Sequence, residues 1–204
     1  MLFKAEDLSK KYNGKLVLDK FSFEADKGQI VGIYGQSGAG KSTVAKIICG
    51  AEKPDSGSFT EFGLKIQMIY QQPWSSLDPS QKIGKGFEEL VKYHHFADGK
   101  ESAEKLIKKQ IAEVGLSEEI LGHLPYQISG GEAQRVAIAK ALMFDPDILV
   151  MDEATSMLDV LTQASIMDLV KKTVIRKGGS VILISHDLEF VNFVCDKIYY
   201  LEGL

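Results

Sequence analysis

Short apolar runs, separated by amphipathic stretches, dominate the pattern of hydrophobic positions along the chain. Such runs are typical of strands buried on both faces, and apolar residues recurring every three to four positions are typical of helices with one buried face. Strands that alternate with helices predict a mostly parallel sheet covered on both sides. The predicted strands are Gln29–Tyr34, Lys65–Tyr70, Ile148–Met151, Val181–Ile184 and Ile198–Leu201, and the predicted helices are Thr43–Cys49, Glu101–Val114, Gly131–Met143 and Val160–Val174.

The N-terminal region departs from this alternation. Two short apolar runs, Leu16–Leu18 and Phe21–Phe23, are separated by two polar residues, and Lys27-Gly28 forms a turn before the first buried strand. Closely spaced apolar runs with turn residues beside them predict a small antiparallel β subdomain.

The segment from about Pro73 to Gln127 contains no convincing strand pattern and is predicted to be mostly helical. Its place between buried strands indicates a helical subdomain inserted into an α/β core. We therefore predict a single domain over residues 1–204, with a core at about 1–72 and 136–204 and a helical subdomain at about 73–135.

Length and charge narrow the class of protein. The chain has 204 residues and a net charge of −4, which gives no indication of the basic face that binds nucleic acids. Its first residues lack the apolar stretch of a signal peptide, and no apolar run approaches the ~18 residues that span a bilayer. Any membrane role is therefore expected to depend on a partner.

Gly35–Ser42 matches the pattern G-x-x-x-x-G-K-[ST] at every position, directly between a predicted strand and a predicted helix. Its glycines let the backbone wrap around an anion with the N–H groups pointing inward, and the following helix adds the positive end of its dipole. Lys41 is expected to reach the β- and γ-phosphates of a nucleotide, and Ser42 is an oxygen ligand suited to Mg²⁺. The expected ATP-binding residues of this loop are Gly35, Gln36, Ser37, Gly38, Ala39, Gly40, Lys41, Ser42 and Thr43.

Two acids directly follow one predicted buried strand, and a histidine follows another. An acid at the C-terminal end of a parallel strand points into the crevice where such sheets bind ligands. We expect Asp152 to hold Mg²⁺, directly or through water, and Glu153 to act as the general base on the attacking water. His186 is expected to reach the γ-phosphate at the edge of the same crevice.

The segment Ile128–Arg135, with the sequence ISGGEAQR, resembles the signature motif of ABC ATPases. Ser129 and Gly131 are expected at a helix N-terminus, which is a favourable site for an anion. The resemblance implies that Ser129, Gly130 and Gly131 close over ATP held by the phosphate loop of a second ATPase subunit.

Other motifs of the ABC ATPases follow in the order of that family. Tyr12 resembles the aromatic residue that stacks on adenine, and Gln71 resembles the Q-loop glutamine that senses the γ-phosphate and Mg²⁺. Ser156–Asp159 resembles the D-loop, which places Asp159 at the interface of the ATPase dimer, and His186 resembles the switch histidine. The resemblance implies Glu153, His186 and Gln71 as catalytic residues, and Ser42, Gln71 and Asp152 as Mg²⁺ ligands.

Gln71–Pro79, with the sequence QQPWSSLDP, is similar to the Q-loop segment of oligopeptide, dipeptide and nickel importer ATPases. This resemblance implies an ATP-hydrolysing subunit that powers a membrane importer for peptides or for nickel and other metal chelates. Its cofactors would be ATP and Mg²⁺, and it would lie peripherally on the cytoplasmic face of the cell membrane. The implied partners are integral membrane permease subunits, a second ABC ATPase subunit, identical or paralogous, and indirectly an extracytoplasmic solute-binding protein, with no nucleic acid.

Several features depart from the pattern of that family. Glu132 stands where Gln is most frequent and Ala154 where Pro is frequent, and neither is expected to remove activity. The stretch between Ser42 and Gln71 is short, so part of the antiparallel subdomain is expected to be trimmed. We also expect no C-terminal extension and no regulatory domain.

Two other classes of protein compete with a transport subunit. The alternative is a soluble ABC ATPase of DNA repair, chromosome handling or translation, which usually carries a long coiled coil, zinc-binding cysteines or two cassettes. The sequence contains none of these features. The third hypothesis is a structural or regulatory partner with an inactive site, against which the intact Lys41, Asp152, Glu153 and His186 argue.

Overall fold

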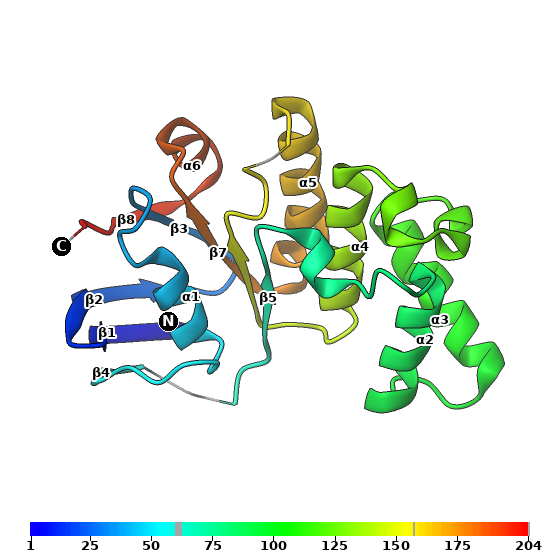
Figure 1. Cartoon of the computed structure of the whole chain (residues 1–204), viewed down its shortest axis with the longest axis horizontal. Coiled ribbons are helices and arrows are strands. Elements are labelled where there is room, and N and C mark those ends of the chain that lie inside the picture. The colour runs from blue at the N-terminus through cyan, green and yellow to red at the C-terminus, as the bar shows by residue number, and fades with distance from the viewer. Residues whose placement is uncertain (60–62, 157, 204) are drawn as a thin grey trace.

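The computed structural model describes residues 1–59, 63–156 and 158–203, and it contains two sheets of different kinds (Figure 1). The larger sheet has the order β5-β6-β7-β3-β8 and all its strand pairs are parallel. The smaller sheet, β2-β1-β4, is antiparallel. The strands are β1 (Phe3–Tyr12), β2 (Lys15–Ala25), β3 (Ile30–Tyr34), β4 (Ser56–Phe59), β5 (Ile66–Ile69), β6 (Ile148–Asp152), β7 (Ser180–Ser185) and β8 (Lys197–Tyr200).

The parallel sheet confirms the five strands predicted from the apolar runs, each to within one residue at either end. Its residues alternate between two apolar cores. Val31, Val150 and Ile182 join the core that also contains apolar residues of β1 and α1. Their chain neighbours Leu149 and Val181 join the core on the opposite face, under α4 and α5. The sheet is therefore buried on both sides, which is why its strands are apolar at successive positions.

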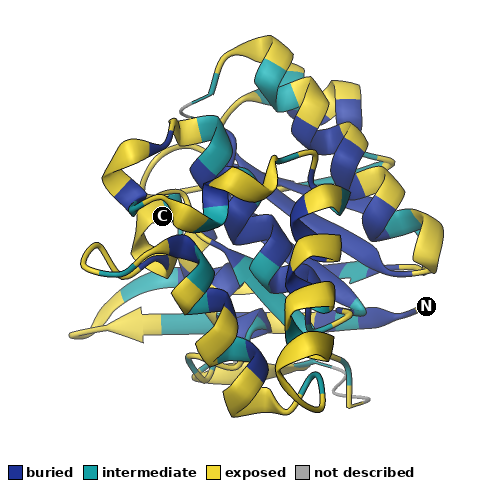
Figure 2. Ribbon diagram, turned by 90° about the vertical axis from the view of Figure 1, so that its right-hand side faces the viewer, coloured by how far each residue is buried: buried dark blue, intermediate teal, exposed yellow. Residues whose placement is uncertain are grey.

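Six α-helices and four short 3-10 helices connect these strands among the described residues. Figure 1 shows α2 and α3 at the end of the molecule farthest from the antiparallel sheet, with α4 and α5 between them and the parallel sheet. Figure 2 shows that the buried positions line the sheet and the inner faces of the helices. The helices are α1 (Lys41–Ile48), η1 (Pro73–Ser76), α2 (Ile83–His94), α3 (Lys100–Glu113), η2 (Glu118–Gly122), η3 (Pro125–Gln127), α4 (Gly130–Leu142), α5 (Val160–Thr173), η4 (Ile175–Lys177) and α6 (Leu188–Val194).

The four predicted helices are present as α1, α3, α4 and α5, and every end agrees to within two residues. The segment 73–127 is helical or irregular throughout, as predicted. The subdomain boundary drawn between residues 135 and 136 stays a prediction, and α4 runs through it without interruption. Within the part of the chain that the structure describes, every helix is too short or too polar to cross a bilayer.

The antiparallel layer is present, but its strands differ from the predicted ones. The two runs at Leu16–Leu18 and Phe21–Phe23 belong to one strand, β2, and the residues between them only deform it, with Lys20 at a φ of 46°. The hairpin turn lies earlier, at Asn13-Gly14, where both residues have positive φ. This dipeptide favours the tight turn that joins β2 to β1. The prediction missed β1 because its polar and apolar residues alternate irregularly across several register shifts.

Candidate functional site

The phosphate loop connects β3 to α1 at the C-terminal edge of the parallel sheet. Gly40, the last residue before α1, has a φ of 96°, and a Cβ there would lie 2.6 Å from the carbonyl oxygen of Val17. Any other residue at this position would be both strained and in contact with β2. The N-terminus of α1 receives no side-chain cap, so its first N–H groups are available to an anion in the loop.

Lys41, the first residue of α1, is almost fully buried. Its Nζ donates to the carbonyl oxygens of Gly35 at 2.8 Å and of Gln36 at 3.0 Å, so the side chain folds back over the loop. The same nitrogen lies 3.0 Å from Oε1 of Glu153, which follows β6. Lys41, which is predicted to bind phosphate, and Glu153, which is predicted to act as the general base, therefore form an ion pair in this structure.

Glu153 contacts the other two residues that are expected to be catalytic, Gln71 and His186. Its Oε2 lies 3.3 Å from Nδ1 of His186 and accepts a hydrogen bond of 3.4 Å from Nε2 of Gln71. These partners come from the ends of β7 and β5, on either side of β6. Glu153 itself has a φ of 50°, an uncommon conformation that turns its side chain at the end of the strand. The parallel sheet thus brings Lys41, Gln71 and His186 into contact with Glu153.

Asp152 precedes this carboxylate and is buried. Burial raises the pKa of its carboxyl group, and a hydrogen bond from the Ser42 hydroxyl opposes that shift. Within the described residues, Oδ1 of Asp152 has no hydrogen-bond partner. A buried carboxylate oxygen without a partner costs free energy, and a hard cation beside Ser42 would satisfy it. The residues present therefore fit a magnesium ion.

Ser129 caps the N-terminus of α4 in a reciprocal arrangement with Glu132. Its Oγ accepts from the backbone N–H of Glu132 at 3.3 Å, while Oε2 of Glu132 accepts from both the N–H and the hydroxyl of Ser129 at 2.8 Å. These hydrogen bonds lower the pKa of the Glu132 carboxyl group. Because position 132 is Glu and not the more frequent Gln, a carboxylate accepts hydrogen bonds from the signature serine, Ser129.

The signature glycines lie beside the D-loop and the start of α5, although the neighbouring residues are 28 and 31 positions apart in the sequence. A Cβ on Gly131 would lie 3.3 Å from Cγ2 of Thr162, and one on Gly130 would lie 3.9 Å from Cδ2 of Leu158. Asp159 caps α5 by accepting from the backbone N–H of Thr162 at 3.1 Å and from its hydroxyl at 2.6 Å. Met157, within the predicted D-loop, lies outside the described residues.

This surface also exposes apolar side chains. Val160 and Leu161 begin α5, and they are 78% and 83% exposed. Exposed apolar residues that lie next to each other are typical of a contact surface. Ser129 bonds to Glu132, and Gly130 and Gly131 face Leu158 and Thr162. Ser156, at the start of the D-loop, donates from its hydroxyl to the carbonyl oxygen of Glu153 at 2.9 Å, so this surface adjoins the residues around Glu153.

Tyr12 lies at the end of β1 and is partly exposed. Its hydroxyl donates to Oε2 of Glu52, and Oε1 of Glu52 lies 3.1 Å from Nζ of Lys46 on α1. Glu52 belongs to no recognisable motif and lies 40 residues from Tyr12, so its place in the site could not be predicted from the sequence. Only the folded chain brings the two together.

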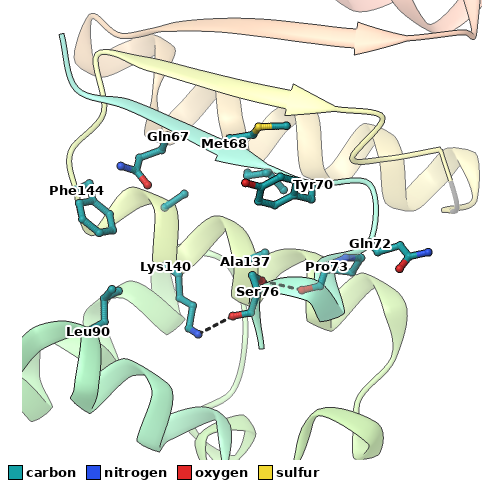
Figure 3. Close-up of a pocket in the computed structure, with 12 residues that line it drawn as sticks. Gln67, Met68, Tyr70, Gln72, Pro73, Ser76, Leu90, Ala137, Lys140 and Phe144 are labelled. Atoms are coloured by element: carbon teal, nitrogen blue, oxygen red, sulfur yellow. Dashed lines mark hydrogen bonds between the residues drawn. The ribbon is translucent and has the colours of Figure 1, made fainter. Parts of the chain in front are cut away.

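Residues of the Q-loop, among them Gln72 and Pro73, line a cavity of about 130 Å³ between β5, η1 and α4 (Figure 3). Lys140 of α4 points across it, and its Nζ donates to the carbonyl oxygen of Ser76 at 3.1 Å. Burial lowers the pKa of this lysine, and the negative charge of Glu89 opposes that shift. Tyr70 and Trp74, on either side of Gln71, are 49% and 40% exposed. The segment that carries Gln71 is therefore attached to α4 at one end and presents aromatic rings to the outside.

Both the sequence and the fold of this chain resemble those of known proteins. The pattern of a protein family described as ABC transporter matches residues 18–156. The dipeptide transport ATP-binding protein DppF of Haemophilus influenzae is 35% identical over 196 residues, covering 89% of this chain and 60% of that protein. The oligopeptide transport ATP-binding protein OppF of Bacillus subtilis is 33% identical over 197 residues, covering 89% and 65%. The chain thus spans 60% to 65% of the length of these curated relatives.

Among solved structures, a dimeric ATP-binding cassette in a post-hydrolysis state, bound to ADP and Pi, superposes with a TM-score of 0.84. The two chains are 28% identical, and the match covers 98% of this chain and 96% of the other. A likeness of this extent includes both sheets and the helical segment inserted between β5 and β6. The α/β fold described above is therefore that of an ATP-binding cassette.

Proposed function

The chain belongs to the ABC transporter family, and from this premise we propose that it is the ATP-binding and ATP-hydrolysing subunit of a membrane importer. One observation carries the proposal. Glu153 contacts Lys41, Gln71 and His186, so a base, a phosphate-binding cation and two polar side chains meet at the mouth of the phosphate loop. These are the groups that phosphoryl transfer to water requires in one place.

The nucleotide lies with its phosphates in the loop Gly35–Thr43. Backbone N–H groups of the loop and the N-terminus of α1 bind the β-phosphate, and Lys41 exchanges Glu153 for the β- and γ-phosphate oxygens. Tyr12 stacks on the adenine base through its exposed ring. The buried, uncapped start of α1 and the exposed Tyr12 support this orientation, since Glu52 ties Tyr12 to the far end of the same helix.

Ser42, Gln71 and Asp152 would hold Mg²⁺. The orphaned Oδ1 of Asp152 and the hydroxyl of Ser42 beside it are the support for this assignment. The ion, when bound, neutralises the charge that accumulates on the β- and γ-phosphate oxygens.

Glu153 removes the proton from the attacking water as the new P–O bond forms and the bond between the γ-phosphorus and the β,γ-bridging oxygen breaks. His186 and Gln71 orient the groups around the γ-phosphate, since both already contact the carboxylate of Glu153. When ATP recruits Lys41, the Glu153 carboxylate is released from its ion pair and becomes free to accept the proton.

A second ATPase subunit completes the site. Ser129, Gly130 and Gly131 of each subunit close over the nucleotide of the other, and Asp159 lies at the same interface. The support is that the signature glycines face the D-loop and α5, and that Val160 and Leu161 at the start of α5 are exposed apolar residues. Burial of those apolar side chains on dimerisation favours the closed state.

The permease contacts the Q-loop, and its cargo is a peptide or a metal chelate. Similarity to dipeptide and oligopeptide transport ATP-binding proteins supports this class. The exposed rings of Tyr70 and Trp74 beside Gln71 support the place of contact. In this arrangement the chain lies peripherally on the cytoplasmic face of the membrane, and a solute-binding protein on the other side delivers the cargo.

Two measurements test the proposal. The purified chain should hydrolyse ATP only when magnesium is present, with a specific activity that rises with protein concentration because two subunits share each site. Affinity capture of the tagged chain from detergent-solubilised membranes should recover an integral membrane permease. Capture of only soluble partners would favour a non-transport ABC ATPase, and no hydrolysis at any protein concentration would contradict the enzymatic role.

A further inference from the structure

Tyr12 is held at the end of β1 by a group of polar side chains that no nucleotide-binding motif includes. Its hydroxyl donates to Oε2 of Glu52. Nζ of Lys10 lies 5.7 Å from the centre of its ring, over one face. Lys10 is fixed in turn by the carbonyl oxygen of Lys53 at 2.7 Å and by Oδ1 of Asp55 at 3.2 Å. One edge and one face of the ring are therefore occupied, and a third of the residue remains exposed for a planar ligand.

Glu52 also connects this ring to the helix that starts at the phosphate loop. Oε1 of Glu52 lies 3.1 Å from Nζ of Lys46, and the backbone N–H of Glu52 donates to the carbonyl oxygen of Lys46 at 3.2 Å. Lys46 lies in α1, five positions after Lys41. One rigid helix therefore joins the phosphate-binding lysine to the carboxylate that holds the aromatic ring.

We propose that Glu52 is a positioning residue of the nucleotide site, which orients the Tyr12 ring for stacking on the base and fixes its distance from the phosphate loop through Lys46. This inference rests on the proposed adenine contact of Tyr12. Glu52 touches neither base nor phosphate, and it acts by restricting the ring before ATP binds. A ring already fixed in the stacking orientation loses less conformational entropy on binding.

The test compares ATP with inorganic triphosphate, which has the phosphates but no base. Binding of each to the whole chain is measured by calorimetry for Glu52→Ala and Tyr12→Phe. Each change should weaken ATP binding about threefold to tenfold, as expected for the loss of one hydrogen bond. Affinity for triphosphate should stay the same, and the turnover of saturated enzyme should change little, so that KM rises while kcat is preserved.

The double variant Tyr12→Phe/Glu52→Ala should bind ATP no more weakly than either single variant, because both remove the same hydrogen bond. Glu101→Ala serves as the matched control, since it removes an exposed carboxylate that is paired with a lysine in the helical segment. It should leave both affinities unchanged.

The outcomes separate this inference from the function it rests on. ATP affinity that falls in Tyr12→Ala but survives Glu52→Ala overturns the role of Glu52 alone. Equal losses for ATP and triphosphate in Glu52→Ala also overturn it, because the effect would then reach the phosphate loop rather than the base. ATP affinity that survives Tyr12→Ala removes the base contact from the proposed function, and the inference with it.

Discussion

Nζ of Lys41 and Oε1 of Glu153 lie 3.0 Å apart at the end of the central sheet, where only 5% and 16% of the two side chains are exposed. The pair compensates two charges that would each be costly if buried alone. In the proposed mechanism, the phosphates of ATP replace Glu153 as the partner of Lys41, and the same exchange frees Glu153 to act as the base.

Glu153→Gln removes the charge that competes with phosphate for Lys41. We expect ATP affinity to be equal to or tighter than that of the unaltered chain, because the amide holds Lys41 less strongly. Turnover should fall by at least about a hundredfold, since Gln cannot accept the proton. Phosphate release and size-exclusion chromatography with ATP measure the two effects, and the variant should accumulate as a dimer. Unchanged turnover would remove Glu153 from the role of base.

His186→Ala removes the imidazole that lies 3.3 Å from Glu153. We expect kcat to fall at least about tenfold, while the Kd for ATP changes less than about twofold, because most binding contacts come from the phosphate loop. His123→Ala, which changes an exposed histidine of the helical segment, is the control and should leave kcat unchanged. A large rise in Kd with constant kcat would assign His186 to binding instead.

Gly40→Ala combines an unfavourable backbone conformation with a contact of 2.6 Å to the carbonyl oxygen of Val17. We expect a loss of about 2 kcal/mol or more in the free energy of unfolding and a strong loss of ATP binding. Gly178→Ala is the matched control, because Gly178 has a φ of 89° but open space where a Cβ would lie. It should lose only about 1 kcal/mol. Equal losses measured by urea unfolding would show that the contact with β2 is unimportant.

Glu132→Gln tests the carboxylate on the signature serine through the pH dependence of stability. The pKa of Glu132 is lowered from 4.5 by its hydrogen bonds to Ser129, so its stabilising effect is present above pH 4.5 and is lost as pH falls through the lowered pKa. The unaltered chain should therefore lose up to about 1 kcal/mol more stability than Glu132→Gln over this range. Urea unfolding at neutral pH and below 4.5 measures the difference. Glu101→Gln, an exposed carboxylate on α3, should behave like the unaltered chain.

The strands of the parallel sheet and the phosphate loop could be predicted because their causes are local. Strands buried on both faces must be apolar at consecutive positions, and Gly40 and Lys41 lie in a pattern whose spacing is set by the geometry of a single turn. The expected position of Glu153 followed from a strand ending in two acids. The structure confirms the strands of the parallel sheet to within one residue at each end.

The antiparallel layer was predicted less well because its pairing is not local. Lys20 interrupts β2 without ending it, and β1 pairs through several register shifts that no fixed period describes. The partner of Tyr12 was invisible for a similar reason, since Glu52 lies on a separate connection and meets it only when α1 packs against the sheets.

The sequence by itself determined the α/β class, the phosphate loop and the family, because each depends on residue types at short, regular spacings. The tertiary structure alone decided that Glu153 is paired with Lys41, that Gln71 and His186 converge on the same carboxylate, and that Glu52 holds Tyr12. The strand order β5-β6-β7 places three sequence-distant strand ends side by side, and such distances depend on how strands pair and not on how residues are spaced along the chain.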